Sequence, residues 1–223
     1  MSSAEDKLLG QIKEKLVASK QLWAKEGRLL TGQRGSGRPA DRLPPGQRLV
    51  KTWPVLDLGV RPDVSTETWS LTVDGLIENP VTLDWPAFMA LKQSECKSDI
   101  HCVTAWSRYD NHWRGVAAAD LLDVVKPKPE ASHVLFQSYD GYTTNLPLSE
   151  FAVAAALLAT HWEGEALSAE HGGPVRVVVP QLYFWKSAKW LKRMTFSAED
   201  HPGFWEVRGY HNRGDPWNEE RYG

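Results

Sequence analysis

The chain has 223 residues, of which 42% are hydrophobic and 24% charged, and its formal net charge is -2. These values are ordinary for a soluble globular protein and exclude a disordered chain, and no apolar run approaches the ~18 residues of a membrane span. The length suffices for one large domain or two small ones. The unusual feature is 11 Trp residues, beside 6 Phe and 6 Tyr. This excess indicates an indole-rich core, the more common arrangement, or a site for a bulky planar ligand.

The two cysteines, Cys96 and Cys102, exclude a disulfide-rich secreted scaffold. The N-terminus has no basic stretch followed by an apolar segment, so we expect a cytoplasmic protein with reduced thiols. The charge is unevenly distributed. Residues 1–50 hold ten Lys/Arg and five Asp/Glu, a net charge of +5, and the remaining residues hold 16 Lys/Arg and 23 Asp/Glu, a net charge of -7. A basic arm that contacts an anionic partner and a solvated basic helix explain this asymmetry about equally well.

The N-terminal segment is predicted to form an amphipathic helix over residues 4–27. Apolar side chains recur there at spacings near three and four, at Leu8, Leu9, Ile12, Leu16 and Trp23. Residues 31–47 are rich in Gly, Pro and Arg, which indicates a linker or an extended arm. We therefore expect an N-terminal arm, residues 1–46, and a domain, residues 47–223. The apolar stripe should be covered by this domain, a second subunit or a partner protein.

Short strands and helices are interspersed along the domain. Strands are predicted at residues 69–73, 81–83, 100–103, 133–137 and 175–179, with a strand or strand pair at 187–196. Helices are predicted at 85–91, 116–125 and, rich in Ala, at 150–159. A polar, aromatic loop is expected after the strand at 100–103. Because no regular βαβ repeat is visible, the pattern predicts an α+β fold with mixed sheets and surrounding helices, rather than a doubly wound fold.

The first candidate site is the segment DIHCVTAWSRYDNHWRG around Cys102. The cationic or titratable side chains near the thiol are His101, Arg108, His112 and Arg114. Such neighbours lower the pKa of a thiol, so Cys102 suits a nucleophile or a soft-metal ligand, although a buried, inert cysteine is more common. A zinc or iron site made of Cys96, His101, Cys102 and His112 is a further alternative, but its spacing matches no usual ligand pair.

The second candidate site is HGGPVRVVVPQLYFWKSAKWLKRMTF, residues 171–196. Its two glycines allow close backbone approach, and Arg176 opens a predicted strand. A guanidinium donates in a fork that suits phosphate, and Lys186, Lys189, Lys192 and Arg193 add positive charge. Residue types alone favour a buried strand with a solvated basic edge over a pocket for a phosphate-bearing cofactor. The motifs GxGxxG, GxxxxGK[ST], GxSxG and HExxH are absent, which removes the common nucleotide-binding, hydrolase and zinc-protease interpretations.

Three motifs in order, HCVTAWSRYDNHWRGV, HGGPVRVVVP and KSAKWLKR, resemble the molybdopterin-binding domain of the sulfite oxidase family over roughly residues 47–212. The segments RLPPGQRL, YTTNLPL and LYFWKSAKW are similar to those of the small, stand-alone bacterial sulfite-oxidase-like oxidoreductases. The resemblance implies the sulfite-oxidase-type fold and one molybdenum-molybdopterin cofactor per chain. It also implies an enzyme that moves an oxygen atom to or from a small substrate while the metal cycles between Mo(VI) and Mo(IV).

The resemblance also implies roles for single residues. Cys102 stands where the family's cysteine ligates molybdenum, and sulfur suits such a metal. Tyr210 matches a tyrosine that reaches the oxo face of the metal, and Arg108, shifted by one position in register, is the candidate for holding an anionic substrate. The implied cofactor-binding positions are Lys51, Thr52, Trp53, Ser138, His171, Arg176, Ser187, Ala188 and Lys189. Among these, His171, Arg176 and Lys189 would bind the pterin and its phosphate end.

The motifs also divide the tryptophans. Those in or beside the matched segments are Trp53, Trp106, Trp113, Trp185 and Trp190, and Trp205 leads to Tyr210. We expect this half near the pterin. The others are Trp23, Trp69, Trp85, Trp162 and Trp217, for which packing is the expected role.

The chain departs from the family's pattern after Cys102. Eukaryotic sulfite oxidases continue with a Gly-Asn-Arg run, whereas Val103 to Arg108 look more like the periplasmic methionine sulfoxide reductase branch, whose export signal we do not find. Sulfite and a sulfoxide therefore both stay open as substrates. No haem, flavin or iron–sulfur motif is visible, so we expect a separate electron-transfer partner, and neither nucleic acid nor a membrane span. The alternatives are a binding module that keeps the fold without the metal, and a thiol or zinc enzyme that uses Cys102.

Overall fold

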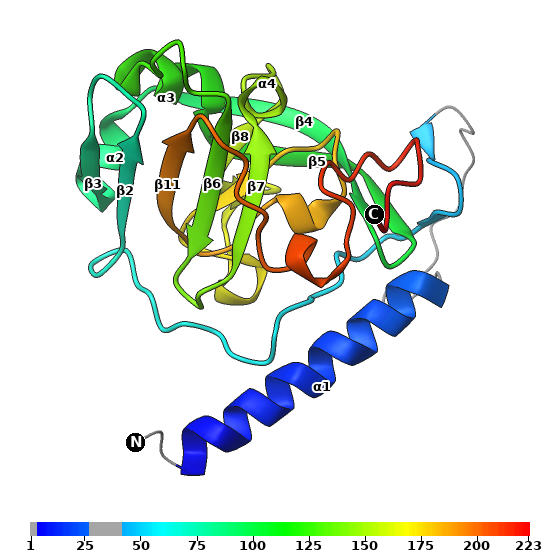
Figure 1. Cartoon of the computed structure of the whole chain (residues 1–223). Helices are drawn as coiled ribbons and strands as arrows, with labels where there is room; N and C mark the ends of the chain where they lie inside the picture. Colours follow the sequence, from blue (N-terminus) through cyan, green and yellow to red (C-terminus); the bar gives the residue numbers. More distant parts are fainter. Residues whose placement is uncertain (1–3, 27–41) are drawn as a thin grey trace.

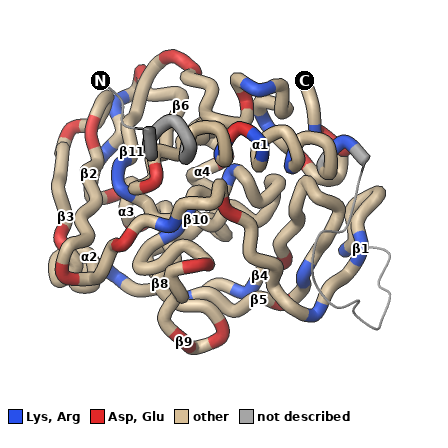
Figure 2. Tube along the Cα trace, turned by 90° about the horizontal axis from the view of Figure 1, so that it is seen from below, with Lys and Arg blue, Asp and Glu red and all other residues tan. Residues whose placement is uncertain are grey.

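The computed structural model describes residues 4–26 and 42–223. An N-terminal helix, α1 (Ala4–Glu26), lies beneath a body made of two β-sheets (Figure 1). This confirms the predicted helix. Seen from below, Lys positions recur along α1 (Figure 2). Residues 1–3 and 27–41 of the predicted arm lie outside the described residues, and the division at residue 46 stays a prediction.

The first sheet has six strands in the order β1-β5-β8-β10, with β4 paired to β5 and β9 paired to β8. Its strands are β1 (Arg48–Leu49), β4 (Gln93–Cys102), β5 (Trp106–Ala117), β8 (Leu157–Trp162), β9 (Glu165–Ala166) and β10 (Arg176–Val178). β1 runs parallel to β5, and the other pairs are antiparallel. The sheet is therefore mixed, as predicted.

The second sheet has five strands in the order β3-β2-β11-β6-β7. They are β2 (Ser70–Gly75), β3 (Val81–Asp84), β6 (His133–Ser138), β7 (Thr143–Pro147) and β11 (Leu191–Ser197). β11 pairs parallel with β2 and antiparallel with β6, so this sheet is also mixed. The helices are α2 (Trp85–Ala90), α3 (Ala118–Val125) and α4 (Leu148–Phe151), and the 3-10 turns are η2 (Ala169–His171), η3 (Phe184–Lys186) and η4 (Glu206–Arg208). The predicted α+β class is confirmed.

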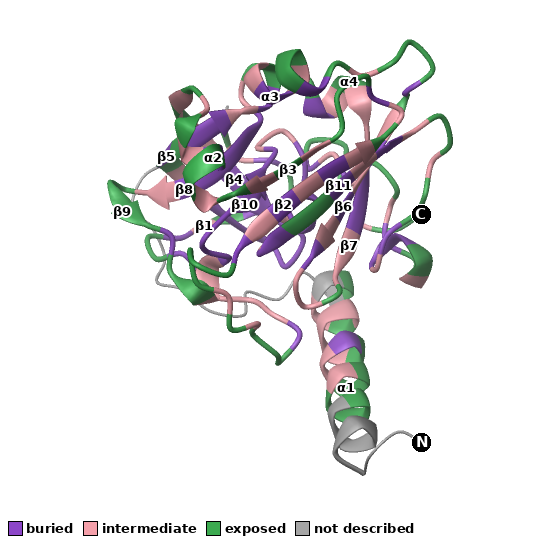
Figure 3. Cartoon of the chain, turned by 90° about the vertical axis from the view of Figure 1, so that its left-hand side faces the viewer, coloured by how far each residue is buried: buried purple, intermediate pink, exposed green. Residues whose placement is uncertain are grey.

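Alternating side chains place the main core between the sheets. In β2, Leu71 and Val73 are fully buried while their neighbours are less so, and Val134 and Phe136 do the same in β6. These residues belong to one hydrophobic cluster, and the buried strands run through the interior (Figure 3). A second cluster, rich in indoles, gathers where β4 ends and includes Val17 of α1.

The predicted Ala-rich helix at 150–159 is wrong. The helix α4 stops at Phe151, and β8 begins at Leu157. Pairing with two neighbouring strands buries Leu157 to Ala159, and this tertiary contact overrides helix propensity. The pairing is close: a Cβ at Gly115 of β5 would lie 2.0 Å from the Leu158 carbonyl oxygen, so only glycine fits there.

The aromatic loop expected after the strand at 100–103 is also wrong. This segment is the long strand β5, which forms a hairpin with β4 across the turn at residues 103–105. Alternation of buried Asn111, Trp113 and Gly115 with exposed residues was a period-2 signal for this strand. Within residues 4–26 and 42–223, no helix has both the length and the apolar character that crossing a membrane requires.

Candidate active site

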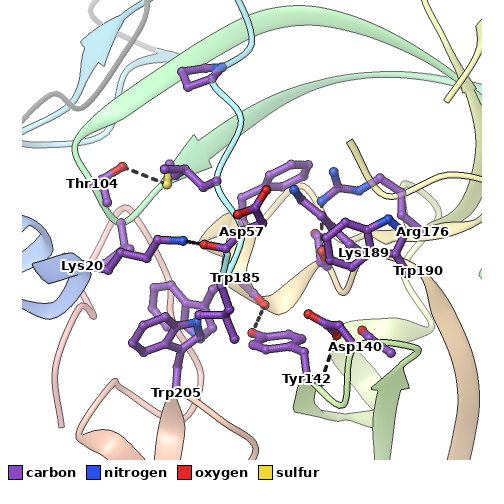
Figure 4. Close-up of a pocket in the computed structure, with 18 of the residues that line it drawn as sticks. Lys20, Asp57, Thr104, Asp140, Tyr142, Arg176, Trp185, Lys189, Trp190 and Trp205 are labelled. Atoms are coloured by element: carbon purple, nitrogen blue, oxygen red, sulfur yellow. Dashed lines mark hydrogen bonds between the residues drawn. The ribbon is translucent and has the colours of Figure 1, made fainter. Parts of the chain in front are cut away.

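A cavity with about 840 Å³ of empty space, including the part open to solvent, lies where strand ends of both sheets meet α1 (Figure 4). The tryptophans that line it are Trp53, Trp106, Trp185, Trp190 and Trp205. All five were expected near the pterin. Two further indoles support this wall from behind, because Trp113 and Trp162 pack edge-on against Trp53 at ring-centroid distances of 5.3 and 4.9 Å.

Cys102 marks one end of the cavity. It is the last residue of β4, and its side chain faces the cavity although the residue is only 6% exposed. Its carbonyl accepts hydrogen bonds from the Ala105 amide and from Gln47 Nε2, each at 3.0 Å, and Ala105 takes a φ of 67° to close the turn. The sulfur atom lies 3.1 Å from Thr104 Oγ1. These contacts fix the direction in which the thiol points.

The surroundings of Cys102 disfavour a bare thiolate. Burial raises the pKa of the thiol, while hydrogen bonds from Thr104 and the charges of Lys20 and Arg221 act in the opposite direction. A thiolate at this position therefore needs a cation beside it, and a bound metal ion supplies one.

Arg176 marks the other end. Its guanidinium is 1% exposed and donates to the carbonyls of His171 at 2.7 Å and Ser187 at 2.9 Å. Burial lowers its pKa to about 9, so it still carries its charge at neutral pH. No carboxylate of the described chain lies within salt-bridge distance of it. A buried cation without a paired anion is costly, so this cavity end is suited to a ligand with an anionic group.

Lys189 adds a second cation at that end. It lines the cavity, and its Nζ donates to the Glu170 carbonyl at 2.6 Å. Burial, followed by the charge of Arg176, lowers its pKa to about 7. Ser187 lines the cavity too, but its hydroxyl accepts from the Val179 amide at 3.0 Å. Ala188 is buried behind the wall, and its carbonyl accepts from the Val177 amide.

Trp53 and His171 form a stacked pair beside Arg176. Their ring centroids lie 3.9 Å apart at an interplanar angle of 20°. His171 Nε2 is 3.4 Å from the Trp53 carbonyl oxygen. Burial lowers the pKa of His171 to about 4. The hydrogen bond to the Trp53 carbonyl raises this pKa, whereas the charges of Arg176 and Lys189 lower it further. His171 is therefore neutral at physiological pH.

This shift gives stability a pH dependence. The pKa of His171 is about 4 in the folded protein and about 6.5 in the unfolded chain. Between these values only the unfolded chain takes up the proton, so the free energy of unfolding should fall as pH drops from 6.5 to 4. His171→Gln should make this fall shallower in urea denaturation, and His201→Gln, at an exposed histidine, should leave it unchanged. An unaltered dependence in His171→Gln would contradict the assignment.

Two polar atoms in the cavity wall have no partner. Ser138 Oγ, at the end of β6, and Trp106 Nε1, at the start of β5, are buried and make no hydrogen bond with any described residue. Buried polar atoms are normally paired, so these two fit a ligand that supplies the missing partners. Together with the unpaired charge of Arg176, they indicate that the residues present suit a large polar and anionic group.

Five predicted site residues lie off the cavity wall: Lys51, Thr52, Arg108, His171 and Ala188. Lys51 and Thr52 come just before Trp53 but are not among the lining residues. Arg108 points elsewhere: its Nη1 lies 3.1 Å from Glu163 Oε1, and its guanidinium packs over Trp162. Its neighbour in β5, Ser107, is fully buried, so strand alternation turns Arg108 away from that side. Arg108 is not positioned beside Tyr210 at the cavity in this structure.

Some lining residues were not foreseen from the sequence. They are Lys20, Asp57, Thr104, Asp140 and Tyr142. For Lys20 a signal exists, because it lies four residues after Leu16 and three before Trp23. A lysine on the apolar stripe of an amphipathic helix faces the protein rather than solvent.

The zinc alternative finds no support in the geometry. No group of three or more His, Cys, Asp or Glu side chains in the described part of the chain is arranged to hold a metal ion. Cys96 and Cys102 are six residues apart in β4, which corresponds to about 20 Å of strand. The Cys96 thiol instead lies near the Ala155 carbonyl.

Comparison with known proteins adds independent information. The model of the family described as the oxidoreductase molybdopterin-binding domain matches residues 58–205. The chain belongs to this family. It is 47% identical to the uncharacterized oxidoreductase YuiH of Bacillus subtilis (strain 168) over 192 residues, which cover 84% of this chain and 97% of YuiH. The protein is therefore an enzyme, an oxidoreductase, and the resemblance found in the sequence motifs is confirmed.

More distant relatives carry different activities in their names. The chain is 29% identical to the catalytic subunit of the protein-methionine-sulfoxide reductase MsrP of Campylobacter jejuni over 159 residues, 64% of this chain and 53% of that subunit. The sulfane dehydrogenase SoxCD of Paracoccus pantotrophus has a similar structure, with a TM-score of 0.60 and 19% identity over 70% of this chain and 46% of that one. The structural likeness confirms the sulfite-oxidase-type fold. The variety of names leaves the substrate to be argued from the cavity.

Proposed function

We propose that the protein binds one molybdenum-molybdopterin per chain in this cavity, with Cys102 as the protein ligand of the metal, and moves an oxygen atom to or from a small substrate. One observation carries the proposal: a single indole-lined cavity joins the buried thiol of Cys102 to the buried, unpaired cation of Arg176. A cofactor with a metal at one end and a phosphate at the other would need a soft ligand for the metal and a cation for the phosphate.

The residues of the cavity would divide the binding of the cofactor. Arg176 and Lys189 would hold the phosphate, and the free Ser138 Oγ and Trp106 Nε1 would bond polar atoms of the ligand. Trp53, with His171 stacked on it, would bound the cavity beside Arg176. When bound, the cofactor supplies two-electron oxygen-transfer chemistry, and the protein orients it and excludes water.

Tyr210 is the group suited to orient a substrate oxygen. It lines the cavity, is 4% exposed and packs between Trp185 and Trp205 at centroid distances of 5.1 and 4.7 Å. Burial, followed by its neighbour Tyr222, raises its pKa above the ordinary value. The hydroxyl therefore keeps its proton at neutral pH and can donate a hydrogen bond to an oxyanion or a sulfoxide oxygen. Electrons would be exchanged with a separate partner.

Elemental analysis tests this proposal directly. Protein purified from a host that makes molybdopterin should contain close to one molybdenum and one pterin per chain and no stoichiometric zinc. Sulfite oxidation and methionine sulfoxide reduction should then be compared with artificial electron carriers to choose between the two substrate classes. Absence of both molybdenum and pterin would favour the non-catalytic binding module, and stoichiometric zinc would favour the zinc enzyme.

A further inference from the structure

The helix α1 supplies part of the cavity wall. Lys20 lines the cavity, and its Nζ donates to the Asp57 carbonyl (Figure 4). The helix is held there by Val17, which is 3% exposed, and by Gln21, whose Nε2 donates to the Arg208 carbonyl at 2.9 Å and whose carbonyl accepts from Tyr222 at 2.7 Å. These contacts place one lysine from outside the matched span of residues 58–205 inside the site.

The charge of Lys20 is not neutralised by an ion pair. No carboxylate of the described residues lies within salt-bridge distance of its Nζ. The Asp57 carboxylate is engaged by Arg61 at 2.9 Å and by the Gly59 amide at 3.0 Å, and Lys20 donates to the main-chain oxygen of Asp57, whose carboxylate acts on Lys20 through its charge without an ion-pair contact. Lys20 therefore has donor capacity left for a ligand, since an ammonium carries three protons.

The position of Lys20 places it on the Cys102 side of the cavity. Lys20 and Cys102 both line the cavity, and Lys20 enters from the side of Thr104, across from Arg176 and Lys189 (Figure 4), although its charge acts on Lys189 as well as on Cys102. Arg176 and Lys189 already supply two cations at the other end. Near Cys102, the guanidinium of Arg221 donates to the Val103 carbonyl at 2.5 Å and is not part of the cavity wall. Lys20 is thus the lining cation at the thiol end among the described residues.

We propose that Lys20 binds the oxyanion of a small substrate at the Cys102 end of the cavity, which makes α1 a part of the active site. This inference rests on the proposed function and names the chemistry of its substrate: a compact oxyanion of the sulfite or sulfate type. It assigns to Lys20 the role that sequence reasoning gave to Arg108. A phosphate of the cofactor is the other source of the same chemistry, and the experiment separates the two.

The probe is inorganic sulfate, titrated against the protein purified from a molybdopterin-producing host and followed by tryptophan fluorescence. The wild type should show a saturable change, because five indoles line the cavity. Lys20→Gln should weaken sulfate binding about 10- to 100-fold, as expected for loss of one charged hydrogen bond. Lys20→Arg should restore most of the affinity. Lys15→Gln is the matched control, since Lys15 is an exposed lysine on the same helix.

Molybdenum and pterin content, measured on the same samples, should be the same in all four proteins. On loaded enzyme, Lys20→Gln should raise KM for sulfite far more than it lowers kcat, and leave KM for a neutral sulfoxide unchanged. Unchanged sulfate affinity in Lys20→Gln, or an equal loss in Lys15→Gln, would overturn the proposal. Loss of pterin without loss of sulfate affinity would also overturn it and assign Lys20 to the cofactor phosphate.

The two proposals fail separately. Absence of molybdenum and pterin from the wild type would contradict the proposed function. The role of Lys20 is tested separately, because sulfate affinity is measured without turnover. If Lys20→Gln loosens α1, Lys20→Arg still decides the matter. Because arginine keeps the positive charge, Lys20→Arg should restore sulfate binding. If Lys20→Arg restored the docking of α1 but not sulfate binding, the result would count against the proposal.

Discussion

Cys102→Ser is expected to abolish molybdenum-dependent activity and to strip most of the metal from the purified protein. Changes to the outer contacts of a metal site already alter affinity or activity by about 10- to 100-fold, so loss of the proposed sulfur ligand should cost more than ~100-fold. Serine is close in size, and the turn at Cys102 is held by its carbonyl rather than by its sulfur. The variant should therefore fold, and its melting temperature should stay near that of the wild type.

The other cysteine provides the matched control. Cys96 lies in the same strand, is half-buried, and its thiol lies near the Ala155 carbonyl, well away from the cavity. Cys96→Ser should keep both molybdenum and activity. Pterin should persist better than metal in Cys102→Ser, since Arg176 and Lys189 would still hold the phosphate. Full metal content in Cys102→Ser would refute the assignment of the ligand.

Much of the fold was readable because local and tertiary preferences agree. The alternation of Leu71 and Val73 predicted β2. The helix predicted at residues 85–91 is α2, where the Asp84 carboxylate accepts from the Ala87 amide at 2.9 Å. Predictions failed where tertiary contacts decide. The alanines at 152–156 favour a helix locally, yet the next residues enter β8 because they complete a sheet with β5 and β10.

The site shows the same division. Cys102, Trp53, Ser138, Arg176, Ser187, Lys189 and Tyr210, all named from motifs, line one cavity. The motifs could not foresee Lys20, because nothing in the sequence fixes where α1 docks. They also place Arg108 at the site, whereas in this structure its guanidinium contacts Glu163, because its direction depends on which side of β5 faces the cavity. The types and order of residues predict the chemistry of a site. Which side chains line it depends on where a helix docks and which side of a strand faces the cavity.

Glu206→Ala is the change expected to destabilise the protein most. Glu206 pairs with Lys186 at 2.7 Å, and their side chains are 2% and 0% exposed. The same carboxylate oxygen accepts from Trp185 Nε1 at 2.9 Å and from Thr144 Oγ1 at 3.0 Å. Removing one partner of a buried ion pair leaves an uncompensated charge, which costs about 3–5 kcal/mol of unfolding free energy. Urea denaturation measures this loss.

Lys92→Met is the control for charge removal at the surface. Lys92 pairs with Asp120 at 2.9 Å but is 74% exposed, so breaking that pair should cost less than about 1 kcal/mol. Lys186→Met, the equivalent change in the buried pair, should cost several times more. Equal effects of Lys92→Met and Lys186→Met would show that burial does not govern the energy of the inner pair.

A double-mutant cycle connects this pair to the cavity. Lys186→Met combined with Glu206→Ala should destabilise by less than the sum of the single changes, because neither charge is then left alone. The double variant still lacks the acceptor for the Trp185 indole, which lines the cavity and packs against Tyr210. The double variant should therefore be more stable than the sum of the single changes predicts. Its sulfate binding and activity should still be lower than those of the wild type. If stability and site function recovered together, Glu206 would act on the site only through the stability of the protein. The Trp185 indole would then keep its position without the Glu206 carboxylate.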